Sequence, residues 1–393
     1  MRVPINENYK KIGESYLFAE IEKRVAAYGT SHPDKKVIRL GVGDVTLPLS
    51  GTVSDAMARA AREMGESATF RGYPPYFGYD FLIEAIKNHY ARSKVALSAD
   101  EIFVSDGAKS DASSFTELFG NALVYVVDPA YPVYVDANIM AGKDVRFIAA
   151  AKENGFCPLP GGRLADGSVV YLCSPNNPSG VVYDKKTLRL WVDAALKTGS
   201  LIIFDSAYES YISGDNPHSI FEIEGARGCA VEICSLSKTA GFTGVRCSWT
   251  VIPKEITLSG VPLGRLWARR QSTKFNGVGY VTQRGAEAAL SNAGYAECLQ
   301  NIAYYMENAR RIAELLDRKG IFYTGGKSSP FVFMECPRGA SSWEFFDFLL
   351  ERAQTVGTPG AGFGKGGEGF FRLTGYAARE DVEEALSRMN VIL

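Results

Sequence analysis

The sequence predicts an α/β protein with a mostly parallel sheet covered by helices, followed by a second, smaller domain. Short apolar runs alternate with amphipathic segments through the first two thirds of the chain, which is the pattern of such a sheet. The 393 residues exceed the roughly 250–300 that a single hydrophobic core usually holds. Hydrophobic residues make up 46% of the chain and charged residues 22%, as in an ordinary globular protein.

Each strand of this sheet is predicted by a short apolar run, and each helix by apolar residues at helical spacing. The strand candidates are residues 101–105, 122–127, 169–173, 201–205, 231–235 and 247–252. The helical candidates are residues 55–64, 80–92, 109–119, 185–198, 280–319, 342–354 and 379–389. We therefore assign residues 46–285 to the large domain. We assign the N-terminal arm, residues 1–45, together with residues 286–393, to the small one.

Composition argues against several classes of protein. The net charge is −1, from 43 basic and 44 acidic residues, so no overall field would attract nucleic acid or an anionic membrane. The longest apolar runs are strand-sized, far short of the ~20 residues of a spanning helix, and the polar N-terminus does not resemble a secretory signal. Seven cysteines without a C-x-x-C pair predict a reducing, cytoplasmic setting. The three scattered histidines predict no metal site, and each is expected at the surface or in a loop.

Three strand exits carry polar residues that could perform chemistry. Ligands of such sheets bind at the carboxyl ends of the strands. There "VVYLC" leads into "SPNNPSG", "LIIFD" into "SAYES" and "VEICS" into "LSKTAGF". Taken singly, each could be a Pro/Gly turn, a cap or a solvated lysine. Their order and spacing carry the information, because Asp205 follows Asn177 by 28 residues and Lys238 follows Asp205 by 33.

In this order the three segments resemble the fold-type I enzymes of pyridoxal 5'-phosphate (PLP), specifically the aminotransferases. The resemblance implies a large domain with a seven-stranded-type sheet, helices on both faces, and a smaller α+β domain. It also implies that Lys238 binds PLP as an imine and then acts as a base, for which it should be partly desolvated. Asp205 would hold the ring nitrogen protonated, and Tyr208 and Asn177 would bond the 3-oxygen.

The same resemblance suggests the remaining contacts. Gly107, Ala108 and Lys109 would offer backbone N–H groups to the phosphate where a strand enters a helix, with Ser235, Ser237 and Arg246 completing its site. Tyr131 would stack on the ring, and Arg372 would clamp the substrate α-carboxylate. The G-x-G-x-x-G match at 362–367 does not follow a strand in a βαβ unit, so we interpret it as a mobile loop near the substrate rather than a dinucleotide site.

Phrases along the chain resemble one subgroup, the LL-diaminopimelate aminotransferases. They include "NENYKKI", "SYLFAEI", "DPAYPVYVD", "NPHSIFEI", "SLSKTAGFTGVR" and "GGEGFFR", and the first two lie outside the cofactor machinery. This resemblance implies conversion of tetrahydrodipicolinate and glutamate to LL-diaminopimelate and 2-oxoglutarate. It also implies a homodimer in which Tyr73 and Asn276 reach into the partner's site. The residues expected to bind substrate are Tyr16, Gly43, Tyr76, Lys109, Asn177, Asn276 and Arg372.

One departure leaves the substrate open. The segment "GYPPYFG" has Tyr76 where the subgroup carries an acidic residue for the substrate's distal ammonium. Tyr76 could instead favour an aromatic or other uncharged side chain. A PLP-dependent carbon–sulfur lyase would use the same lysine and aspartate, and a PLP-sensing regulator would need a DNA-binding module and a basic face that the sequence does not display.

Overall fold

The computed structural model describes residues 3–12, 17–41, 43–162 and 164–393. Its central element is a seven-stranded sheet in the order β2-β8-β7-β6-β5-β3-β4, in which only β8 runs antiparallel to its neighbours. The predicted mostly parallel α/β sheet is therefore confirmed. The strands are β2 Ile102–Ser105, β3 Val124–Asp128, β4 Val145–Ala149, β5 Val169–Cys173, β6 Leu201–Asp205, β7 Ala230–Ser235 and β8 Ser248–Val251.

Helices cover both faces of this sheet, because both faces of its strands are apolar. Alternate residues of a strand point to opposite faces. Val170 and Leu172 of β5 pack with α6, whereas Val169 and Tyr171 pack with α4 and α5. The helices on the first face are α3 Asp80–Ala91, α6 Lys185–Thr198 and α9 Tyr280–Leu290, and those on the second are α4 Ala108–Ser114, α5 Val133–Met140 and α8 Leu263–Lys274.

A second core is built from both ends of the chain. Its sheet has the order β11-β12-β15-β14, and a separate pair, β1 and β13, joins the N-terminal segment to the C-terminal part. The strands are β1 Ile38–Arg39, β11 Tyr323–Gly325, β12 Phe331–Glu335, β13 Thr355–Val356, β14 Thr358–Pro359 and β15 Phe370–Thr374, and the helices are α1 Leu17–Ser31, α11 Ser342–Ala353 and α12 Arg379–Ile392. The domain limits given above stay a prediction.

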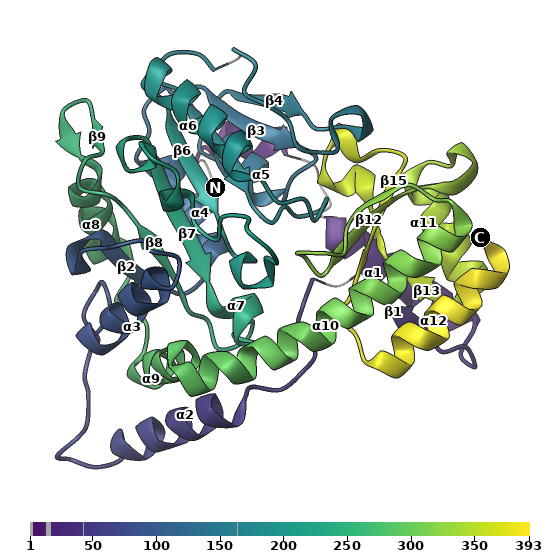
Figure 1. Ribbon diagram of the computed structural model, residues 1–393, viewed down its shortest axis with the longest axis horizontal. Helices are drawn as coiled ribbons and strands as arrows, with labels where there is room; N and C mark the ends of the chain where they lie inside the picture. The colour runs from purple at the N-terminus through teal and green to yellow at the C-terminus, as the bar shows by residue number, and fades with distance from the viewer. Residues whose placement is uncertain (1–2, 13–16, 42, 163) are drawn as a thin grey trace.

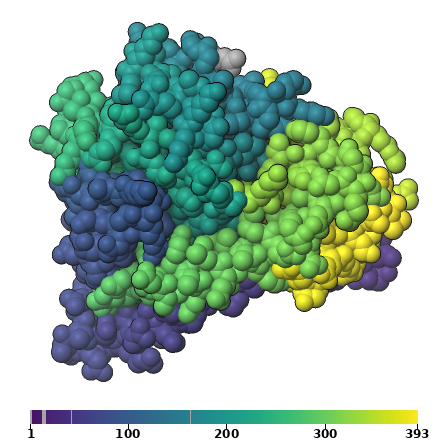
Figure 2. Space-filling view, in the orientation of Figure 1, coloured from purple at the N-terminus to yellow at the C-terminus, as the bar shows by residue number. Residues whose placement is uncertain are grey.

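One long helix, α10 (Asn292–Lys319), runs between the two cores. Near its start Cys298 packs with the large sheet's helices, and near its end Leu315 and Leu316 pack in the second core. Figure 1 shows it crossing from α9 beneath the large sheet to α11 and α12. Helix α2 (Gly51–Glu63) lies against α9 and projects from the body at the lower left of Figure 2.

The described ranges contain no helix with the length and apolar character needed to cross a membrane. All seven cysteines are free, and only Cys157 is not fully buried.

Candidate active site

A cavity of about 410 Å³ lies at the carboxyl ends of the parallel strands, between the large sheet and the second core. It is lined by residues that follow β2, β5, β6 and β7, together with residues from the N-terminal segment and from β15. Twelve of the predicted site residues line it: Gly43, Ala108, Lys109, Tyr131, Asn177, Asp205, Tyr208, Ser235, Ser237, Lys238, Arg246 and Arg372.

Lys238 lies in α7 (Leu236–Thr239), a single turn that starts directly after β7. The turn begins at Ser235, whose hydroxyl oxygen accepts a bond from the Ser237 N–H at 3.1 Å. The Lys238 ammonium donates to the Gly43 carbonyl, and its nitrogen lies 5.8 Å from the centre of the Tyr376 ring. Burial lowers the pKa of Lys238 to about 8. A substantial fraction of this amine is thus neutral, and able to act as a nucleophile, slightly above neutral pH.

Asp205 is the last residue of β6 and is 7% exposed. The Tyr134 hydroxyl donates to its Oδ2 at 2.6 Å, and the Ala207 N–H donates to its Oδ1 at 3.0 Å. Burial raises the pKa of Asp205, and these two bonds oppose that rise. A cationic N–H placed beside this carboxylate would stabilise the ionised form further, which is the role predicted for Asp205.

Tyr208 and Asn177 line the same cavity as Asp205 and Arg372. Burial raises the pKa of the Tyr208 phenol well above its ordinary value, so it stays a neutral donor. The Asn177 Oδ1 accepts a bond of 2.5 Å from Nη1 of Arg372, which leaves the Asn177 NH₂ as its donor group. Both side chains can therefore donate a hydrogen bond to an anionic oxygen.

Arg372 is held in the middle of β15 and is 1% exposed. Besides Asn177 it bonds the Gly41 carbonyl through Nη2 at 2.7 Å, and its guanidinium lies over the rings of Phe331 and Phe363 at 4.5 and 4.8 Å. Burial lowers its pKa to about 10. Its buried Nε has no hydrogen-bond partner among the described residues. A buried cation with an unused donor fits an anionic ligand group such as a carboxylate.

Another group of side chains in the cavity forms a cradle for an anion. Gly107 has φ 152°, and a Cβ at this position would lie 2.0 Å from Nη2 of Arg246, so the guanidinium packs directly on the glycine backbone. A side chain at 107 would displace it. Arg246 also bonds the Thr243 carbonyl at 3.0 Å, and Ser235 and Ser237 line the same cavity. One guanidinium and two hydroxyl-bearing residues suit a phosphate.

The structure does not bring three of the predicted residues to the cavity of the same chain. Tyr73 is 88% exposed, Tyr76 is 47% exposed, and Asn276 is exposed. Their two segments nevertheless lie side by side, because a Cβ on Gly277 would lie 2.5 Å from the Pro75 carbonyl oxygen. Tyr16, also predicted to bind substrate, lies outside the described residues.

Other residues that were not predicted also line the cavity: Phe18, Asp44, Tyr134, Cys173, Ala207 and Thr243. Tyr134 lies on α5 (Val133–Met140), and its hydroxyl meets Asp205 only because that helix packs on the sheet, so no local pattern marks it. Phe18 and Asp44 come from the N-terminal segment, and no local pattern places that segment at the sheet edge.

The prediction for the histidines was wrong for His89. It lies on α3 and its side chain is only 10% exposed, because its imidazole contacts the buried Glu209. His218 lies in a loop, as expected, and contacts the same carboxylate. Neither histidine lines the cavity that contains Lys238.

Comparison with known proteins relates this geometry to one family. The sequence profile described as "Aminotransferase class I and II" matches residues 35–389. The LL-diaminopimelate aminotransferase of Agathobacter rectalis is 49% identical, over 99% of this chain and 99% of that protein. The enzyme of the same name from Bacteroides fragilis is 48% identical over 98% of each chain.

Solved structures give the same result. The L,L-diaminopimelate aminotransferase of Chlamydomonas reinhardtii superposes with a TM-score of 0.93 at 38% identity, covering 100% of this chain and 99% of that one. A Thermus thermophilus aspartate aminotransferase, bound to maleate, superposes with a TM-score of 0.86 at 22% identity over 100% of both chains, which shows a shared fold.

Proposed function

We propose that this chain, which belongs to the class I and II aminotransferases and among them to the LL-diaminopimelate aminotransferases, transfers an amino group from glutamate to tetrahydrodipicolinate and releases LL-diaminopimelate and 2-oxoglutarate. One observation carries the proposal: Lys238, Asp205 and Arg372, from three separate parts of the chain, line a single cavity. A nucleophilic amine, a buried carboxylate and a buried guanidinium are the groups that this reaction requires.

The residues present fit PLP. The cradle of Arg246, Gly107 and the two serines suits its phosphate, and Asp205 suits its ring nitrogen. Bound PLP supplies an aldehyde and an electron-withdrawing ring, which together make the amino group transferable and the α-proton acidic. Lys238 is the amine positioned to hold the cofactor and, once displaced, to move the proton at the substrate Cα.

Arg372 would orient the substrate by bonding its α-carboxylate. Its contacts with Asn177 and Gly41 and the rings of Phe331 and Phe363 fix the plane of the guanidinium. The substrate therefore meets a donor whose orientation is already set, which lowers the entropy cost of binding.

We also propose a cytoplasmic homodimer with shared sites, in which Tyr73 and Asn276 serve the partner. Their exposure and the adjacency of their segments support this assignment. Mixing Lys238→Ala chains with Asn276→Ala chains tests it, because one site of each mixed dimer would then combine an intact Lys238 with an intact Asn276. Activity should exceed that of either variant alone; activity that stays at the level of the separate variants would argue against shared sites.

Tyr76 supports a second candidate, transamination of an aromatic amino acid. Loss of a charged partner for the distal ammonium would weaken its binding by about 1.5–3 kcal/mol, or roughly 10- to 150-fold. Rates with LL-diaminopimelate, lysine, phenylalanine and glutamate as donors to a keto acid decide between the two. We expect diaminopimelate to be used best, and phenylalanine turning over as fast would favour the second candidate. Formation of pyruvate and ammonia without a keto acceptor would instead identify a carbon–sulfur lyase.

A further inference from the structure

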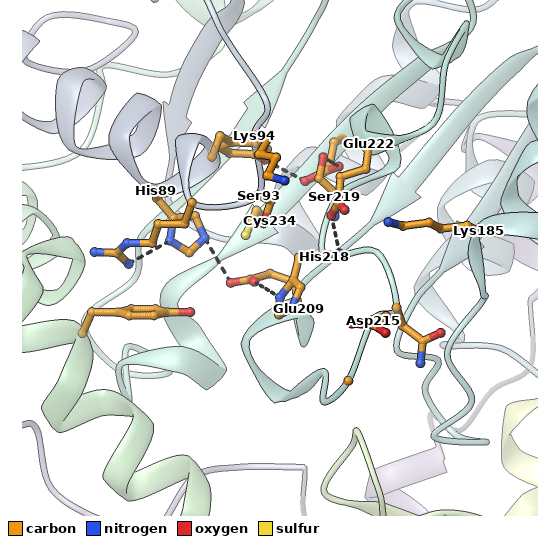
Figure 3. Close-up of a pocket in the computed structure, with 16 residues that line it drawn as sticks. His89, Ser93, Lys94, Lys185, Glu209, Asp215, His218, Ser219, Glu222 and Cys234 are labelled. Carbon is orange, nitrogen blue, oxygen red and sulfur yellow. Dashed lines mark hydrogen bonds and ion pairs between the residues drawn. The ribbon is translucent and has the colours of Figure 1, made fainter.

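A second cavity, of about 620 Å³, has none of its lining residues in common with the cavity that contains Lys238, and Figure 3 shows the side chains around it. The residue at its centre is Glu209, the immediate neighbour of Tyr208 in the chain. The proposed transamination gives no role to this residue, although it is 5% exposed. A buried carboxylate is costly unless it is paired, so its partners indicate what it does.

Two histidines from different parts of the chain hold the Glu209 carboxylate. Nε2 of His89 lies 3.2 Å from Oε1, and Nδ1 of His218 lies 3.2 Å from Oε2, the two contacts drawn in Figure 3. The Ser210 hydroxyl also donates to Oε1. Burial would raise the pKa of the Glu209 carboxyl, but the two imidazoles and this hydroxyl hold it well below its ordinary value. Glu209 therefore stays ionised, and it ties its own turn to α3 through His89 and to the loop that carries His218.

This clamp is connected to Lys238 through hydroxyl groups. The Thr239 hydroxyl donates to Ser210 Oγ at 3.1 Å, and Tyr295 of α10 donates to the same oxygen at 3.4 Å. Thr239 follows Lys238 directly, and the Tyr211 hydroxyl donates to the Lys238 carbonyl at 3.1 Å. The turn that contains Glu209 thus bonds the turn that contains Lys238 at two points.

We propose that Glu209 is a positioning residue for the active site: through Ser210 and Thr239 it sets the place of Lys238, and through the backbone it sets the place of Tyr208. Glu209 touches neither substrate nor cofactor. It acts by holding the turn that contains Tyr208 at a fixed position relative to the turn that contains Lys238. The inference rests on the proposed function, because it assigns Lys238 and Tyr208 to the reaction. Small displacements of such groups can lower a rate about 100-fold.

The variant Glu209→Gln tests the proposal, because it preserves shape while removing the charge that both histidines bind. We expect kcat to fall on the order of 10- to 100-fold with KM changed less than about threefold, since the substrate contacts of Arg372 are untouched. Two readouts do not depend on turnover: the dissociation constant for PLP, which should rise, and the pH midpoint of the visible absorbance of PLP bound at Lys238, which should shift.

Thr239→Val and Thr239→Ser test the link itself. The valine variant removes the hydroxyl at nearly constant volume, and it should shift the absorbance midpoint in the same direction as Glu209→Gln. The serine variant retains the hydroxyl and should restore the wild-type midpoint. The Glu209→Gln/Thr239→Val double variant should show less than the sum of the two single effects, because both changes break one chain of bonds.

Glu101→Gln is the matched control, since Glu101 is another buried glutamate, paired with Arg227 at the amino end of β2. It should lower the melting temperature but leave PLP affinity, absorbance midpoint and kcat unchanged. The proposal is overturned if folded Glu209→Gln protein matches wild type in all three, or if it differs from Glu101→Gln only in stability. Wild-type protein that binds no PLP would instead refute the proposed function.

Discussion

The bond from Tyr134 to Asp205 gives a prediction whose size follows from the structure. In Tyr134→Phe the carboxylate loses a donor at 2.6 Å and keeps only the Ala207 N–H at 3.0 Å. A hydrogen bond to a charged group contributes about 1.5–3 kcal/mol, which corresponds to roughly 1–2 pKa units. Because the Tyr134 bond lowers the pKa of Asp205, its loss raises that pKa further above the ordinary value.

The expected consequence is a shift of the acid limb of the kcat/KM profile. Only ionised Asp205 stabilises a protonated ring nitrogen, so activity should disappear at a higher pH in Tyr134→Phe than in wild type. PLP affinity should also fall, at most by about 10- to 150-fold, which is the hydrogen-bond energy of about 1.5–3 kcal/mol expressed as a ratio of dissociation constants. Equilibrium dialysis against PLP and a pH series of steady-state rates measure the two effects separately.

Tyr171→Phe is the control for this change. Its ring stacks on that of Tyr134 at 5.2 Å between centroids, but its hydroxyl donates to the Ala112 carbonyl rather than to Asp205. The variant deletes the same atom from the neighbouring ring and should leave the acid limb unmoved. The reasoning would be refuted if the acid limb of the kcat/KM profile shifted equally in the two variants, or if it did not shift in Tyr134→Phe.

Three further outcomes follow from the site and its surroundings. In cofactor-free protein Lys238 should react with an amine reagent with a midpoint near pH 8; a midpoint at the ordinary lysine value would show that burial does not act as described. Burial raises the pKa of Asp111 to about 7, so the folded protein must give up a favourably bound proton as pH rises from about 4 to 7, and wild-type stability should fall over that range. Asp111→Asn should abolish this fall in denaturant titrations. Equal pH dependence in both proteins would contradict the prediction. In Gly41→Ala the new Cβ would lie 2.5 Å from the Gly357 carbonyl carbon, so residue 41 must move, and with it the residue 41 carbonyl that binds Arg372. KM should therefore rise more than kcat falls, and an unchanged KM in folded protein would be inconsistent with this.

Local patterns located most of the large sheet but not all of it. The six predicted strands are present, because each is a run of apolar residues buried on both faces. Strand β4 was missed, since it lies at the sheet edge and only Ile148 of its five residues is buried. The predicted helix 280–319 is two helices that meet at Ser291, whose hydroxyl caps α10 by accepting from the Gly294 N–H. The helical spacing of apolar residues continues across Ser291, so it did not reveal that one helix ends and another begins there.

The site divides in the same way. Asn177, Asp205 and Lys238 could be predicted because each lies at the end of its strand or within a few residues after it, so spacing along the chain encodes their common edge. Tyr134 and Asp44 could not be placed by such spacing, since they meet Asp205 and Lys238 only when separate segments pack together. Glu209 gave no signal, because its importance depends on two histidines more than a hundred residues apart.

By itself the sequence determined the α/β sheet and the polar groups that line its carboxyl edge, because these depend on periodicity and short-range order, and its motifs resembled those of one family. Only the tertiary structure decided how those groups are tuned. Burial shifts the pKa values of Lys238 and Arg372, and contacts between distant segments supply the bonds to Asp205 and Glu209. Desolvation and long-range packing are properties of the assembled core, and no stretch of sequence contains them.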